Sequence, residues 1–144
     1  MDITFDTAFP ARTARSRELF ERAKITIPGG AGSTARLPRN GWKPYPLFIE
    51  QGRGSRITDV DGNEYIDYLL GLGPDILGHR HPVVTQAVID AIGDHGTSFG
   101  LPYELEIEAS EKVVAAVPGV EQVRFANSGS EAVGQAVRIA RATT

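Results

Sequence analysis

The chain has 144 residues, a formal net charge of −3, 41% hydrophobic and 23% charged residues. These values are typical of one globular domain, and without a basic or acidic block they exclude the electrostatic footprint of a nucleic-acid-binding protein. The sequence contains no cysteine, which excludes disulfides, thiolate metal ligands and a cysteine nucleophile and favours a cytoplasmic protein.

The first half of the chain predicts a helix, a long loop and short strands. Apolar residues recur at helical spacing over residues 13–26, and Pro28-Gly29-Gly30 ends the pattern. Residues 31–46 are rich in Gly, Pro, Ser and Arg, which is typical of an irregular loop. Strands are expected over residues 47–50, 55–60 and 64–68, with Asp61-Gly62 as the turn between the last two.

The second half predicts helices around a single strand. A glycine-rich loop over residues 71–82 leads into a helix over 82–94, and a second helix over 103–117 ends at Pro118-Gly119. An apolar run predicts a strand over 120–126, followed by a helix from 130 to about 142. This order indicates an α/β fold whose parallel sheet begins in this chain.

Acidic side chains around the predicted hairpin raise the question of a calcium site. Asp59, Asp61 and Asn63 have the spacing of calcium ligands. A calcium-binding EF-hand loop needs Gly at its sixth position and Glu at its twelfth, where this chain has Glu64 and Leu70. A plain hairpin is therefore the better interpretation.

Two histidines in the second glycine-rich loop could in principle bind zinc. His79 and His81 are two residues apart, but the chain has only His95 besides them, and it has no cysteine to complete a site. We therefore expect a structural loop in which one histidine is hydrogen-bonded to the backbone.

The segment Asn127-Ser128-Gly129-Ser130-Glu131 joins the predicted strand to the last helix. Free backbone N–H groups, two hydroxyls and the helix dipole meet at such a turn, which favours binding of a phosphate group. Gly129 would let the phosphate approach the backbone closely. Ser128 and Glu131 also have the spacing of a capping box, which would satisfy the helix end without a ligand. The residues alone leave both interpretations open.

Arg36 closes the segment Ser33-Thr34-Ala35-Arg36 in the first long loop. A planar guanidinium is the preferred partner of a substrate carboxylate. An arginine on a loop is more often simply solvated, so spacing alone leaves this function open as well.

Six segments, taken in order, resemble one enzyme family. They are Ile27-Pro28-Gly29-Gly30, Ser33 to Arg36, the hairpin over 59–68, Leu77-Gly78-His79-Arg80-His81-Pro82, Ser98-Phe99-Gly100, and Asn127-Ser128-Gly129-Ser130-Glu131-Ala132. Their order and spacing are similar to the N-terminal part of class III aminotransferases, fold-type-I enzymes that use pyridoxal 5'-phosphate (PLP). Within that family the glutamate-1-semialdehyde 2,1-aminomutases are the most similar, and the resemblance begins at about residue 16.

The resemblance implies a fold and a set of site residues. Ser128, Gly129 and Ser130 would bind the PLP phosphate, and Arg36 with Ser33 beside it would bind the substrate carboxylate. Residues 1–75 would form the helix and hairpin segment of a small domain, and residues 76–144 the start of the large PLP-binding domain. Members of the family are homodimers that act on small amino acids or amino aldehydes.

The function implied is PLP-dependent transfer of an amino group, with the intramolecular amino shift of an aminomutase as the alternative. Leu72 stands where the aminomutases have a tryptophan, which favours the aminotransferase. The Schiff-base lysine of the family lies downstream of the phosphate turn, whereas Lys24, Lys43 and Lys112 all precede it. We therefore expect an N-terminal fragment that has no catalytic residue of its own and is inactive alone. A non-catalytic fragment that binds a phosphate or a partner protein is the alternative from another class.

Overall fold

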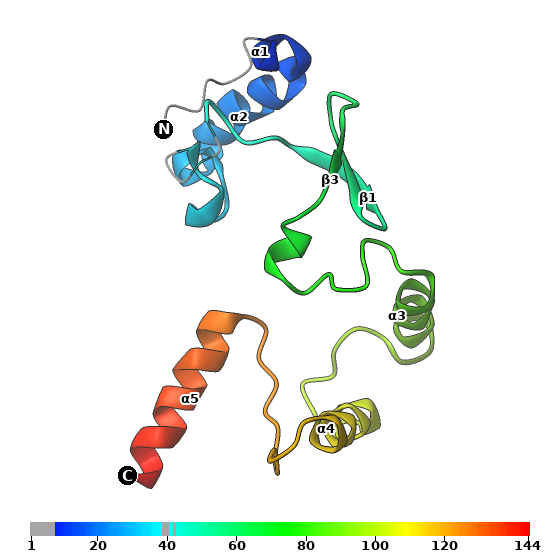
Figure 1. The fold of residues 1–144 in the computed structure, drawn as a ribbon. Helices are drawn as coiled ribbons and strands as arrows, with labels where there is room; N and C mark the ends of the chain where they lie inside the picture. Colours follow the sequence, from blue (N-terminus) through cyan, green and yellow to red (C-terminus); the bar gives the residue numbers. More distant parts are fainter. Residues whose placement is uncertain (1–7, 39–40, 42) are drawn as a thin grey trace. The chain divides into compact units, whose positions relative to one another are not determined.

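The computed structural model describes residues 8–38, 41 and 43–144. Two compact units divide this part of the chain, one ending at His95 and the other comprising Gly96–Thr144. Figure 1 shows the helices and strands in chain order, coloured from blue to red.

The first unit begins with two helices, α1 (Phe9–Arg12) and α2 (Ala14–Thr26). The second of them confirms the helix predicted over 13–26, whereas the short α1 was not predicted. Gly30 follows α2, and its lack of a side chain is required, because an added Cβ atom would lie 2.5 Å from the ring of Phe20. Phe20 is itself buried, so this glycine lets the chain turn back against the helix.

An antiparallel sheet contains β1 (Ile49–Arg53), β2 (Arg56–Asp59) and β3 (Glu64–Ile66) in that order. The first strand lies about two residues later than the predicted 47–50. Its position follows from pairing, because Arg53 lies opposite Arg56 and leaves a two-residue turn at Gly54-Ser55. Residues 39, 40 and 42 of the predicted loop over 31–46 lie outside the described residues.

The Asp61-Gly62 turn between β2 and β3 is confirmed, and Asp59 organises it. The carboxylate of Asp59 is fully buried and accepts hydrogen bonds from the backbone N–H groups of Asp61 and Asn63 and from the hydroxyl of Tyr65. Burial, and then the hydrogen bond to Asp59, raise the pKa of Tyr65 to about 12. The acidic residues of this segment therefore build the hairpin.

Asp61 connects the hairpin to the start of α2. Its carboxylate accepts hydrogen bonds from the N–H of Arg15 at 2.6 Å, from the N–H of Ser16 at 3.0 Å and from the hydroxyl of Ser16 at 2.8 Å. Thr13, the residue before the helix, provides no side-chain cap. A residue of the hairpin thus caps a helix 45 positions earlier.

The loop between β3 and α3 (Pro82–His95) turns back to the sheet. Gly54 and His79 form an antiparallel bridge with two backbone hydrogen bonds, of 2.9 and 2.8 Å. One histidine of this loop was expected to bond to the backbone; His79 does so through its own backbone, and its ring lies 2.6 Å from the carboxylate of Asp67. The ring contact was not predicted, because Asp67 is 12 positions away.

The second unit contains α4 (Glu104–Ala116) and α5 (Gly129–Thr143), which confirm the two predicted helices. The strand predicted over 120–126 is absent, since these described residues have no regular hydrogen-bonded structure. An apolar run forms a strand only where a neighbouring strand takes up its backbone N–H and C=O groups. In the described residues of this unit no such neighbour is present.

Much of the apolar surface of the helices is exposed in the described part of the chain. Val84, Val88 and Ile92 form an exposed row on α3, and Val133 and Val137 are exposed on α5. Amphipathic helices normally bury such faces against other elements. None of the described helices is both long and apolar enough to cross a membrane.

Candidate functional site

The start of α5 has the local structure of a capped helix. Ser128 is the N-cap residue, with φ −150° and ψ 158°, and its hydroxyl oxygen accepts a hydrogen bond from the N–H of Glu131 at 3.3 Å. The carboxylate of Glu131 accepts in return from the N–H of Asn127 at 2.9 Å. The capping interpretation therefore explains Ser128 and Glu131, although the glutamate reaches one residue before the N-cap.

Capping leaves the donors in the middle of the turn available. Within residues 96–144, the N–H groups of Gly129 and Ser130 and the hydroxyl of Ser130 donate to no protein acceptor. The space beside Gly129 is open, because no atom lies within 4 Å of the position of an added Cβ atom. A cavity of about 330 Å³ lies beside this end of the helix and is lined by Asn127 and Glu131, but not by Gly129 or Ser130. Convergent N–H groups at a helix N-terminus are suited to an anion.

Arg36 lies in the first unit, at the end of the short 3-10 helix Thr34–Arg36. Its N–H donates to the carbonyl of Ser33 at 3.0 Å, so the two predicted substrate residues belong to one turn. Arg36 lines a cavity of about 560 Å³ whose walls are mainly apolar side chains of the sheet. Ser33 is not among the residues that line this cavity.

The same cavity contains a polar pair that sequence analysis missed, Asp67 and His79. Asp67 accepts hydrogen bonds from the N–H groups of Leu69 and Leu70 at 2.8 and 3.1 Å, in addition to its contact with His79. The hydrogen bond to His79 and those to the backbone outweigh burial and lower the pKa of Asp67. No local pattern could have found this pair, because the two residues come from different ends of a loop.

Gly52 provides the space that His79 occupies. A Cβ atom at this position of β1 would lie 2.6 Å from Cγ of the His79 ring. The glycine therefore lets the imidazole lie against the strand while it contacts Asp67.

Similarity to known proteins establishes the family. Residues 38–144 match the family model described as "Aminotransferase class-III". The chain belongs to the class III aminotransferase family. The family resemblance of the six sequence segments is thereby confirmed.

Two curated relatives are aminomutases. The chain is 54% identical over 133 residues to glutamate-1-semialdehyde 2,1-aminomutase of Syntrophomonas wolfei, and 52% identical over 129 residues to that of Chloroherpeton thalassium. These alignments cover 92% and 90% of this chain. The chain spans about 30% of the length of each relative.

Two solved structures with similar folds are transaminases. A structure described as "Transaminase with PLP bound" has a TM-score of 0.83 at 45% identity and covers 90% of this chain. An omega-transaminase from Sphaerobacter thermophilus has a TM-score of 0.86 at 38% identity and covers 95%. In each case the match comprises 30% of the other chain. The expected fold class, part of an α/β fold-type-I transferase, is confirmed.

Proposed function

We propose that this chain provides the cofactor-phosphate site of a PLP-dependent enzyme that transfers an amino group. The observation that carries the proposal is the turn at the start of α5, where the N–H groups of Gly129 and Ser130 and the Ser130 hydroxyl donate to no acceptor in the described residues. The turn lies in a chain of a family whose solved members include a transaminase with PLP bound.

Each residue of the turn has a physical role in the proposal. Gly129 and Ser130 donate backbone N–H groups to the phosphate oxygens, and the Ser130 hydroxyl adds a further donor. Ser128 holds the first turn of the helix in place through its bond with Glu131. The positive end of the helix dipole favours the phosphate dianion. PLP, when bound, supplies an electron sink for charge that develops on the substrate.

Arg36 is proposed to bind the carboxylate of the substrate, with Ser33 in the same turn. Support comes from its place at an otherwise apolar cavity, where a guanidinium is a strong partner for a carboxylate. The apolar walls formed by Ile49, Ile57 and Ile66 would contact the less polar part of a small amino acid or amino aldehyde.

The proposal has further parts that concern the whole enzyme. The covalent lysine of the family lies beyond the phosphate turn, whereas Lys24, Lys43 and Lys112 precede it, so residues 1–144 would not complete the reaction by themselves. We assign 1–75 to the small domain and 76–144 to the start of the large domain. The proposed enzyme is a homodimer. We place it in the cytoplasm, since a sequence without cysteine suits a reducing compartment.

The phosphate site can be tested by PLP titration of the full-length protein, followed by absorbance. Ser130→Ala removes one charge-assisted hydrogen bond and is expected to weaken PLP binding about 10-fold. Ser110→Ala is the matched control, because the Ser110 hydroxyl bonds to the Ile107 carbonyl within α4. An equal affinity of the Ser130→Ala variant and the unmodified protein would remove the basis of the proposal.

A second candidate function is the intramolecular amino shift of an aminomutase. Its specific support is the 54% and 52% identity to the two glutamate-1-semialdehyde aminomutases. Dependence on a second substrate separates the two reactions. The full-length aminotransferase would need an added amino acceptor, whereas an aminomutase would convert glutamate-1-semialdehyde with none. Turnover without acceptor would therefore replace the first candidate with the second.

A further inference from the structure

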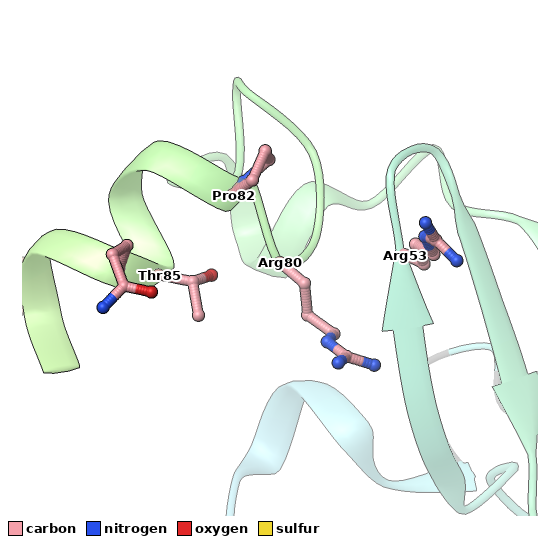
Figure 2. A pocket seen from close by; sticks show the side chains of 5 residues that line it. Arg53, Arg80, Pro82 and Thr85 are labelled. Carbon is pink, nitrogen blue, oxygen red and sulfur yellow. The ribbon is translucent and has the colours of Figure 1, made fainter.

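Two arginines lie next to the bridge that joins the β1–β2 hairpin to the loop before α3. Gly54 and His79 form the antiparallel bridge at this point. Arg53 precedes Gly54 and Arg80 follows His79, so the two arginines flank this bridge. Figure 2 shows Arg80 between Thr85 of α3 and Arg53 of the hairpin. Two positive side chains thus belong to segments that are held together by the backbone hydrogen bonds between Gly54 and His79.

Within residues 8–95, neither of these arginines forms an ion pair in the described structure. Arg56 provides a contrast, because it lies opposite Arg53 but is bonded to the carboxylate of Glu64 at 2.5 Å. Like charges at facing strand positions repel each other. Of the three neighbouring arginines, Arg53 and Arg80 are therefore left without a counter-charge.

The two arginines line a cavity of about 440 Å³, together with Pro82, Thr85 and Gln86. This volume is in the range of small-molecule sites. The lining contains two guanidinium groups, a hydroxyl and an amide, and it contains no carboxylate. Guanidinium groups match the oxygens of phosphate in a bidentate geometry. Arg80 adopts a left-handed backbone conformation, with φ 55°.

We propose that Arg53 and Arg80 form a binding site for a phosphate dianion, either inorganic phosphate or the phosphate of a small monoester. A phosphate group, which carries about 1.5 to 2 negative charges near neutral pH, balances most of the charge of two guanidinium groups. A carboxylate would balance only one of them. The Thr85 hydroxyl and the second N–H of the Gln86 amide, whose first N–H donates to Asp90 at 2.7 Å, supply hydrogen bonds to the remaining oxygens. The site shares no residue with the turn proposed to hold PLP.

The test is titration of the isotope-labelled full chain with inorganic phosphate at constant ionic strength, followed by amide NMR. Saturable shifts are expected at Gly54 and from residue 79 to residue 86, read separately from any shifts at 128–131. Arg53→Gln and Arg80→Gln should each weaken this binding about 10-fold. Arg56→Gln removes an equal charge next to the site and should leave the affinity within about twofold. Unchanged spectra away from the site would show that each variant is folded.

Two further ligands identify the source of the phosphate. Glycerol phosphate that binds more tightly than inorganic phosphate would indicate a monoester, and the reverse order would indicate the free ion. Acetate should bind much more weakly than either. The proposal is overturned if phosphate shifts only the amides at 128–131, if acetate binds equally well, or if Arg56→Gln weakens binding as much as Arg53→Gln. Phosphate-dependent stabilisation, measured by thermal unfolding, provides a second readout for any variant whose spectrum is weak.

Discussion

The Nε2 atom of His79 lies 2.6 Å from Oδ2 of Asp67 and connects the two ends of the loop between β3 and α3. At one end, Asp67 also accepts the N–H groups of Leu69 and Leu70. At the other, the backbone of His79 is bonded to Gly54 on the sheet. The buried carboxylate of Asp67 therefore fixes the position of the loop residues that line the same cavity as Arg36.

Asp67→Asn is expected to destabilise the fold at neutral pH by about 1–3 kcal/mol, since it weakens a buried charged hydrogen bond. The pKa of Asp67 is lowered from 3.8 in the folded protein, chiefly by His79. Its carboxylate therefore stabilises the fold above about pH 3.8, and this contribution is lost as the pH falls through the lower folded-state pKa. Urea unfolding should show a difference between the variant and the unmodified protein that shrinks below pH 3.8.

Asp94→Asn on the exposed surface of α3 is the control for this experiment. It should change the free energy of unfolding by less than about 0.5 kcal/mol, both at neutral pH and below pH 3.8. A pH-independent effect of Asp67→Asn would contradict the charged contact with His79.

Two glycine substitutions in the first unit should have opposite effects on stability. Gly52→Ala places a Cβ atom 2.6 Å from the His79 ring, so the ring must move, at a cost of about 1–3 kcal/mol. Gly93→Ala lies in α3 with nothing within 4 Å and should stabilise the helix by up to about 1 kcal/mol. Thermal unfolding measures both changes. Equal effects of the two substitutions would exclude the close approach of His79 to β1.

Asp61→Ala is expected to reduce stability by about 1–2 kcal/mol, because it removes the cap of α2. Burial opposes ionisation of Asp61, but the bonds from Ser16 and Arg15 outweigh it and lower its pKa. Glu18→Ala is the comparison, because its ion pair with Arg15 is exposed on the same helix and should contribute less than about 0.5 kcal/mol. Urea unfolding followed by circular dichroism gives both values, and similar losses would argue against the cap.

Local patterns predicted the helices well. Apolar spacing and the Pro-Gly stops located α2, α3, α4 and α5 to within one or two residues, because helix bonds and helix ends are local in sequence. The turn at Asp61-Gly62 was likewise predicted from the two residues that form it. For the phosphate turn, Ser128 and Glu131 have the predicted capping role, and the donors at Gly129 and Ser130 stay available for the proposed ligand.

Features that depend on distant residues were not predicted. The strand expected over 120–126 needs a neighbouring strand, which the apolar run itself does not specify. The partner of His79 is Asp67 and the cap of α2 is Asp61, and neither pairing leaves a periodic signal in the sequence. The shared cavity of Arg53 and Arg80 depends on the bridge between Gly54 and His79, which forms only when the loop returns to the sheet.

Recognition of a phosphate by Gly129 and Ser130, in the turn that Ser128 caps, is tested most directly by two affinities of the full-length protein. They are the affinity for PLP and the affinity for pyridoxal, which lacks the phosphate. PLP should bind at least about 100-fold more tightly, because its phosphate accepts several charge-assisted hydrogen bonds that pyridoxal cannot make. Gly129→Pro should reduce this ratio, because proline is tolerated at the first helical position but has no N–H to donate. Equal affinities for the two compounds, or a ratio unchanged by Gly129→Pro, would contradict the proposed phosphate site.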